Sequence, residues 1–182
     1  MRFLVTTADT ALAEIEEAAR LPMDEDAFRA FYDRTARSLW AYLSRLTGDR
    51  QLADDLLQET FYRFCRAGAT HENETHRRNS LFLIATNLVR DTMRRRQYAD
   101  VVPLETDAHH IDHGAAERTE GRTDLARAMK QLKPAQRALI TLAYGQGASH
   151  AEIAEILGLK SASIKSLLFR ARRRLGQLLE RS

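Results

Sequence analysis

The sequence predicts an all-α fold: two small helical domains joined by a flexible linker, the C-terminal one a helix-turn-helix. Three observations carry this prediction. Apolar residues recur at the three- and four-residue spacing of amphipathic helices on both sides of residues 99–122. That stretch lacks the periodicity and contains proline, glycine and scattered charges, as linkers do. Near the C-terminus, a glycine separates two short amphipathic patterns, and the second is rich in Lys and Arg.

Composition and charge distribution limit the possible classes of protein. Of the 182 residues, 44% are hydrophobic and 29% are charged, which is typical of a globular chain with one large domain or two small ones. The net charge is only +3, but basic residues cluster in 77–96 and 160–174, whereas acidic residues gather in 14–26 and 54–59. A basic run repels itself unless a polyanion neutralises it, so 160–174 indicates a nucleic-acid partner.

The cysteine count and the lengths of the apolar runs bear on the compartment. The single cysteine, Cys65, excludes an internal disulfide framework and fits a reducing cytoplasm. It lies in an apolar helical pattern, so we expect a small buried side chain. No apolar run is long enough to span a membrane, and the N-terminal apolar run is too short for a signal peptide. We therefore expect a cytoplasmic protein without a membrane partner.

The first predicted domain covers residues 23–98 and follows a leader, 1–22, to which we assign no function. Pro22 marks a break, and Asp24 can cap a long helix that ends near Thr47. Large apolar side chains recur along this helix at helical spacing and predict a core-facing stripe, made of Phe28, Phe31, Tyr32, Leu39, Trp40, Leu43 and Leu46.

The second predicted helix has an acidic outer face. Gly48 can end the first helix, and Asp49 can cap the second, which runs to about Ala67. Four polar side chains occupy its outward positions: Asp54, Asp55, Gln58 and Glu59. Spacing alone leaves open whether these side chains solubilise the helix or bind a partner.

A third, basic helix is predicted to begin at Ser80, after a loop at residues 68–79. Its apolar residues, from Leu81 to Met93, keep helical spacing and face inward. Several polar side chains lie off this stripe or at its edge: Asn87, Arg90, Arg94, Arg95 and Arg96.

The linker, 99–122, separates the two domains, which we expect to move relative to each other. It contains His109, His110 and His113, which could form part of a metal site. Flexible linkers often hold histidines without a ligand, and no cysteine or suitable carboxylate set completes a metal shell here. We therefore predict neither a metal nor a cofactor.

The second predicted domain, 123–182, contains the helix-turn-helix. Ser149 and Glu152 have the spacing of a capping box at the start of a short helix, and Gly158 can end that helix in a left-handed conformation. Ser161 can cap the second helix, whose inner stripe is Ile164, Leu168, Ala171, Leu175 and Leu178.

These motifs together resemble the extracytoplasmic-function sigma factors of bacterial RNA polymerase, in the sigma-70 superfamily. ADDLLQETFYRF (53–64) is similar to region 2.2, which docks on the polymerase clamp. SLFLIATNLVRDTMRRR (80–96) is similar to regions 2.3–2.4, which open and read the −10 element. The stretch from Lys130 to Leu175 is similar to region 4, which reads the −35 element. The resemblance implies a sigma factor that binds core polymerase and directs promoter recognition and opening, located at the bacterial nucleoid.

The resemblance also implies a role for each matching side chain. Asp54, Asp55, Gln58 and Glu59 would contact core polymerase. Asn87 would hold a flipped base of the melted −10 strand, and Arg90, Arg94 and Arg95 would hold its phosphates. Lys165, Ser166, Phe169 and Arg170 would enter the major groove of the −35 duplex, and Arg173 would meet phosphate. An anti-sigma factor is a further possible partner.

Two other interpretations remain open from the sequence. The chain could be a two-domain helix-turn-helix regulator that dimerises through its N-terminal half, or a sigma-like decoy that binds polymerase but does not initiate transcription. The acidic helix followed by a basic one favours a sigma factor, because a dimerisation domain needs neither. The sequence shows no activated nucleophile, phosphate-binding glycine loop or convincing metal set, so we do not expect an enzyme.

Overall fold

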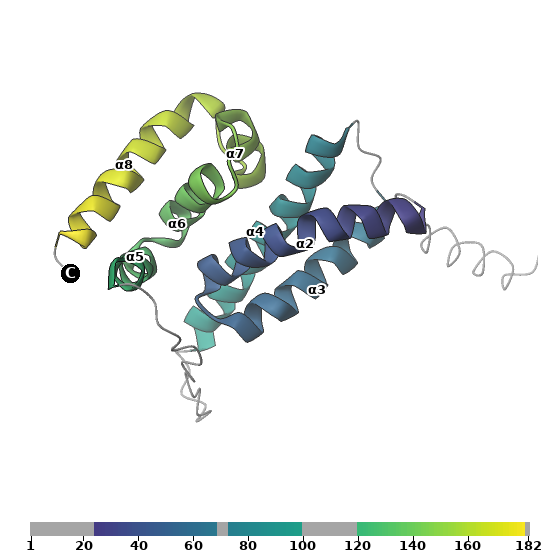
Figure 1. Ribbon diagram of the computed structural model, residues 1–182, viewed down its shortest axis with the longest axis horizontal. Helices are drawn as coiled ribbons and strands as arrows, with labels where there is room; N and C mark the ends of the chain where they lie inside the picture. Colours follow the sequence, from purple (N-terminus) through teal and green to yellow (C-terminus); the bar gives the residue numbers. More distant parts are fainter. Residues whose placement is uncertain (1–23, 69–72, 100–119, 181–182) are drawn as a thin grey trace, which may run out of the picture.

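The computed structural model describes residues 24–68, 73–99 and 120–180, and within these ranges the regular structure is helical. Helices α2, α3 and α4 form one group, and α5 to α8 form a second group beside it (Figure 1). The predicted all-α fold with two helical domains is thereby confirmed. The leader, most of the linker and its three histidines lie outside the described residues.

The first two helices begin and end at the residues that the sequence predicts. Helix α2 spans Glu25–Thr47, and the side chain of Asp24 accepts a hydrogen bond of 2.7 Å from the amide of Ala27. Gly48 ends α2 with φ of 71°, a left-handed conformation that glycine adopts without a steric penalty. Helix α3 spans Arg50–Arg66 and is capped by Asp49.

Helix α4, Glu74–Ala99, begins six residues before the predicted Ser80. The prediction of a loop through residue 79 was wrong, because it relied on apolar periodicity, which this polar first segment lacks. One local contact and one contact with α2 stabilise the early turns instead. The side chain of Asn73 accepts from the amide of His76 at 2.9 Å, and Glu74 pairs with Arg34 of α2 at 3.0 Å.

Aromatic side chains fill the core between α2, α3 and α4. Phe31 stacks on Phe64 with ring centroids 5.4 Å apart, and Tyr42 packs against Phe82. The hydroxyl of Tyr42 is 2.8 Å from that of Thr86, so the buried phenol keeps a hydrogen-bond partner. Burial raises the pKa of Tyr42 to about 12, because the core disfavours the phenolate.

The C-terminal domain comprises α5 (Glu120–Gln131), α6 (Pro134–Ile140), a π-helical turn η1 (Thr141–Gly145), α7 (His150–Leu157) and α8 (Ser161–Leu179). The capping box of Ser149 and Glu152 is confirmed, and Gly158 ends α7 with φ of 65°. The predicted cap at Ser161 is wrong by one residue. Lys160 is the N-cap of α8, and it makes no capping hydrogen bond with its side chain.

The two domains are docked on each other, α4 against α7, and α2 against α6 and η1. Buried apolar residues of α2–α4 and of α6–α8 form one continuous cluster across this contact. Their mutual burial favours the docked arrangement. It differs from the expectation of separately moving domains, because the sequence pattern shows which face of a helix is apolar but not which helix covers it.

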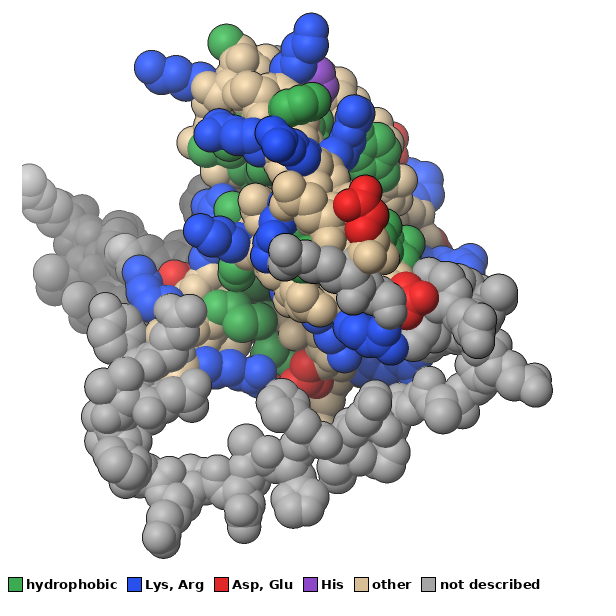
Figure 2. Space-filling model, turned by 90° about the vertical axis from the view of Figure 1, so that its left-hand side faces the viewer, with side chains coloured by type: hydrophobic (Ala, Val, Ile, Leu, Met, Phe, Trp, Pro, Cys, Tyr) green, Lys and Arg blue, Asp and Glu red, His purple; other side chains and the backbone are tan. Residues whose placement is uncertain are grey.

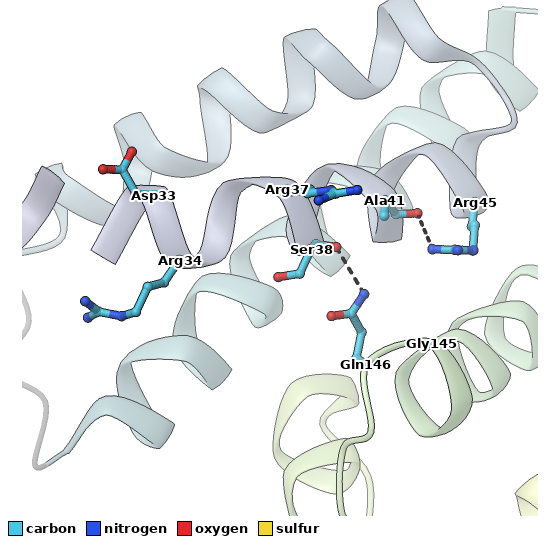
Figure 3. A pocket seen from close by; sticks show the side chains of 8 residues that line it. All are labelled: Asp33, Arg34, Arg37, Ser38, Ala41, Arg45, Gly145 and Gln146. Carbon is cyan, nitrogen blue, oxygen red and sulfur yellow. Dashed lines mark hydrogen bonds between the residues drawn. The ribbon is translucent and has the colours of Figure 1, made fainter. Parts of the chain in front are cut away.

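We call the polar contacts across this boundary the interdomain seam; its residues are Ser38, Leu46, Arg78, Asn79 and Arg90 on one side and Arg137, Gln146, Glu155 and Leu157 on the other. Figure 3 shows part of it, where the amide of Gln146 donates to the carbonyl of Ser38 at 3.0 Å. A hollow of about 380 Å³ opens beside this bond between α2 and the end of η1.

Candidate nucleic-acid interface

The outer face of α8 carries the side chains predicted to enter a DNA groove. Ile164, Leu168 and Ala171 are buried on its inner face, and the predicted contacts are exposed: Lys165, Ser166, Phe169, Arg170 and Arg173. The structure therefore brings these five residues onto the exposed part of one helix. Figure 2 views the side of the molecule on which α8 lies, where Lys and Arg side chains outnumber acidic ones. Such a face suits a polyanion.

A basic and aromatic pair extends this face beyond the predicted residues. The guanidinium of Arg172 donates to the hydroxyl of Tyr144 at 3.2 Å, and this bond connects α8 to η1. Tyr144 is 61% exposed, and Phe169, one turn before Arg172, is 59% exposed. No sequence pattern indicates this pair, because the two residues are 28 positions apart and lie on different helical elements, α8 and the π-helical turn η1.

Leu167, unlike its exposed neighbours on α8, lies on the inner side of the helix. It is half-buried and packs against the continuous apolar cluster. A residue held there faces the protein, so its contribution is to packing.

The predicted −10 residues occupy the exposed parts of α4 but have different partners. Asn87 and Arg95 are exposed, and Arg94 pairs with Asp91 at 3.0 Å. Arg90 lies in the interdomain seam, where its guanidinium donates to the carbonyl of Leu157 at 3.1 Å. Arg90 thus differs from the other three because its partner lies in the C-terminal domain.

The acidic face of α3 lies on solvent, as predicted. Asp55 and Gln58 are exposed, and Glu59 pairs with Arg63 at 2.6 Å. Asp54 accepts a hydrogen bond of 2.6 Å from the indole nitrogen of Trp40 on α2. Asp54 therefore has a partner within the protein that the sequence did not indicate, in addition to its predicted contact with core polymerase.

Two charged groups in the C-terminal domain have shifted pKa values. Burial lowers the pKa of Arg137, whose guanidinium donates to the carbonyl of Met129 in the last turn of α5 at 2.8 Å and to that of Leu46 on α2 at 2.8 Å. Hydrogen bonds from Ser149 lower the pKa of Glu152, because they favour the carboxylate. Arg137 fixes the domain contact, whereas Glu152 fixes the start of α7.

The described residues also bear on membrane-spanning and metal-binding sites. None of the helices placed by the structure is long and apolar enough to cross a membrane. Within residues 24–68, 73–99 and 120–180, His, Cys, Asp and Glu side chains form no group of three or more that could hold a metal ion. His109, His110 and His113 lie outside these ranges.

Comparison with known proteins identifies the class. Residues 31–98 match the sigma-70 region 2 family, and residues 122–175 match the family described as sigma-70, region 4. The helix-turn-helix domain and the domain with the acidic and basic helices are thus the two regions of a sigma-70 protein.

Full-length relatives narrow the class. The chain is 33% identical to the ECF RNA polymerase sigma factor SigL of Mycobacterium tuberculosis over 156 residues, which cover 84% of this chain and 88% of SigL. It is 29% identical to the RNA polymerase sigma factor CarQ of Myxococcus xanthus, over 85% of this chain and 90% of CarQ. The chain belongs to the ECF RNA polymerase sigma factors.

A solved structure shares the arrangement of the fold. The sigma factor RpoE of Bartonella quintana, in a complex with the anti-sigma factor NepR, matches with a TM-score of 0.67 and 29% identity. The match covers 85% of this chain and 97% of that one. CnrH, in a complex with the cytosolic domain of CnrY, also matches in fold with a TM-score of 0.67, at 24% identity.

Proposed function

We propose that the chain binds core RNA polymerase through α3 and directs it to promoters with a −10 and a −35 element. The observation that carries this proposal is the presence of two exposed faces that differ in charge. One is acidic and polar, on α3, and the other is basic and aromatic, on α8. Opposite charges on two faces suit two different partners, a protein and a nucleic acid.

The proposed −35 contact uses the five exposed residues of α8. The planar guanidinium of Arg170 can pair with both acceptors of a guanine, and Lys165 and Ser166 offer further donors along the same helix. The exposed ring of Phe169 suits apolar contact with a thymine methyl group. Arg173 and Arg172 contribute positive charge toward phosphates.

The proposed −10 contact uses the exposed part of α4. Asn87 would hydrogen-bond a base that leaves the stack, and Arg90, Arg94 and Arg95 would neutralise the phosphates of the melted strand. Flipping a base costs a few kcal/mol of unstacking, which these contacts must offset. Arg90 is exposed and uses Nη2 of its guanidinium on the carbonyl of Leu157, which leaves other N–H groups for a phosphate.

An anti-sigma factor is a proposed further partner. The support is the likeness to the RpoE chain, whose structure was solved in a complex with the anti-sigma factor NepR. The test is co-purification of the full chain with proteins encoded beside its gene, read by mass spectrometry.

Transcription with purified components tests the proposed function. Core polymerase, the full chain and a library of genomic fragments are combined, and the 5′ ends of the transcripts are mapped. We expect transcripts that depend on the chain and whose start sites share two upstream motifs. Binding to polymerase without transcripts would instead identify a decoy. Sequence-specific DNA binding in the absence of polymerase, again without transcripts, would identify a regulator.

A further inference from the structure

Arg172 on α8 is held in place by a neutral side chain from another element. Its guanidinium donates to the hydroxyl of Tyr144, in the π-helical turn η1, at 3.2 Å. Other surface arginines, such as Arg63 and Arg127, pair with carboxylates of their own helices. A phenol orients a cation without neutralising it, and no acidic residue lies within 160–174. Arg172 is therefore an oriented guanidinium that keeps its positive charge on an exposed surface.

The turn η1 places Tyr144 within reach of α8. The amide of Gln146 donates to the carbonyl of Thr141 at 3.0 Å, in the π-helical pattern. Thr141 and Leu142 are buried at the start of the turn, whereas Tyr144 is exposed. Helices α6 and α8 pack against each other (Figure 1). The turn that continues α6 therefore lies beside α8, at the level of Arg172.

The pair offers two kinds of hydrogen-bond donor at one place. Arg172 has several N–H groups, and the bond to Tyr144 uses only part of this capacity. The phenolic oxygen accepts that bond, so its own proton remains available to a further acceptor. A hydroxyl that accepts from a cation is polarised and becomes a stronger donor. An anionic oxygen that approaches from solvent, such as a phosphate oxygen, suits both groups.

The pair lies at one end of a row of predicted DNA contacts. Lys165, Phe169 and Arg172 follow one another at helical spacing, so their side chains share one side of α8. Lys165 and Arg172 are about 10 Å apart along the helix axis, or roughly three base-pair steps of duplex. Arg172 is also one turn from the buried Leu168, so it lies on the flank of α8. When the outer face of α8 enters a groove, this flank meets the sugar–phosphate backbone.

We propose that Tyr144 and Arg172 form a phosphate clamp, in which Tyr144 positions the guanidinium and both side chains donate to one backbone phosphate of duplex DNA. The clamp has no base preference of its own, because every base pair presents the same phosphates. It fixes the position of α8 on the duplex. This proposal rests on the proposed function only for the identity of the duplex as a −35 element, since the clamp itself requires only duplex DNA.

The clamp is tested with the full-length chain and a fluorescent duplex of mixed sequence, by anisotropy at a series of salt concentrations. Tyr144→Phe keeps the ring and removes only the hydroxyl. We expect it to weaken binding about three- to ten-fold with an unchanged salt slope, because a hydrogen bond is lost but no charge is. Arg172→Ala should weaken binding about ten-fold or more and lower the slope of log affinity against log salt by about one.

A second tyrosine–arginine pair supplies the matched control. On α3 the hydroxyl of Tyr62 accepts from Arg66 at 3.4 Å, and Tyr62 is 58% exposed against 61% for Tyr144. Tyr62→Phe should leave the affinity for duplex DNA unchanged, because α3 carries the acidic face. Arg174→Ala removes another exposed charge from α8 and measures the general effect of charge on binding.

Coupling between the two residues distinguishes positioning from two independent contacts. In an Arg172→Ala background, Tyr144→Phe should change the affinity by less than about two-fold, because the phenol no longer has a cation to orient. Arg172→Lys keeps the charge but lacks the planar fork, so it should restore the salt slope without the full affinity. Thermal unfolding of each variant checks the fold, which should persist because both side chains are exposed.

Equal affinities of Tyr144→Phe and Tyr62→Phe would overturn the clamp, as would an Arg172→Ala effect no larger than that of Arg174→Ala. A lack of measurable duplex binding by the unaltered chain at low salt would also overturn it. None of these measurements requires polymerase. A chain that shows the clamp but does not support transcription would contradict the proposed function alone, and a transcribing chain with normal binding by Tyr144→Phe would contradict the clamp alone.

Discussion

Helices α4 and α8 are both basic, yet they use their polar residues differently. Helix α8 buries one stripe, and its remaining sides lie on solvent, so Arg170 and Arg173 are free to meet DNA. Helix α4 packs against α2, α3 and α7. Its polar residues therefore include exposed side chains such as Asn87 and Arg95, and three, Arg78, Asn79 and Arg90, that bind the other domain. A basic residue off an apolar stripe can thus serve a protein contact as well as a nucleic acid.

The largest expected effect concerns neither basic helix but the acidic face of α3, which we propose binds core polymerase. Asp55→Arg should weaken binding to core polymerase about a hundred-fold or more, because a reversed charge adds repulsion to the loss of attraction. Asp55 is exposed, so the fold should persist. Asp26→Arg makes the same change on exposed α2 and serves as the control. Equal affinities of the two variants, measured by fluorescence anisotropy, would remove the polymerase assignment from α3.

The second prediction concerns the stability of the first domain at alkaline pH. The pKa of Tyr42 is about 12 when folded and about 10 when unfolded, so the folded state retains its proton longer. Its contribution is complete below pH 10 and is lost as the pH rises toward 12, by about 2–3 kcal/mol. Tyr42→Phe should remove this step from denaturant unfolding curves measured between pH 9 and 12. A step of the same size in Tyr42→Phe would assign it to another group.

The third prediction concerns phosphate contact by α8. Arg173→Ala should weaken binding to duplex DNA of any sequence and lower the slope of log affinity against log salt by about one. Arg29, an exposed arginine that pairs with Glu25 on α2, provides the control as Arg29→Ala. If Arg173→Ala leaves the salt slope unchanged, then this part of α8 does not meet phosphate.

The smallest expected effect concerns the start of α7. The folded state lowers the pKa of Glu152, so its contribution is present above the ordinary glutamate pKa and is lost as the pH falls through the folded value. Glu152 is half-buried at the start of a helix, where a capping interaction is worth about 1 kcal/mol. Glu152→Gln should be less stable than the unaltered chain at pH 7, with the difference disappearing under acid. A difference that persists at pH 3 would indicate that packing, not charge, stabilises the cap.

Local patterns predicted the helices of both domains, because caps and stripes depend on residues three or four positions apart. Asp24, Asp49 and the Ser149–Glu152 pair are examples. Where a helix begins in a polar segment, as α4 does, the apolar stripe gives no signal. The irregular turn η1 likewise has no sequence pattern that distinguishes it from the helix it continues.

The exposed residues of α8 were predictable from the three- and four-residue spacing of its apolar stripe. The contacts between different helices at the candidate sites were not predictable. Trp40 with Asp54, Tyr144 with Arg172, and Arg90 with Leu157 join residues 14, 28 and 67 positions apart. Such pairs depend on how helices pack, which the pattern of a single helix does not determine.

The assignment of α4 to the −10 element and α8 to the −35 element is tested most directly by a promoter library randomised at both elements. Transcription is measured with core polymerase and the unaltered chain, Asn87→Ala or Arg170→Ala. Loss of one bidentate base contact costs about 1–3 kcal/mol, so Arg170→Ala should relax the preference at a −35 position only. Asn87→Ala should relax the preference at a −10 position only. If both variants change the same element, or if neither changes its preferences, the two helices do not read DNA as proposed.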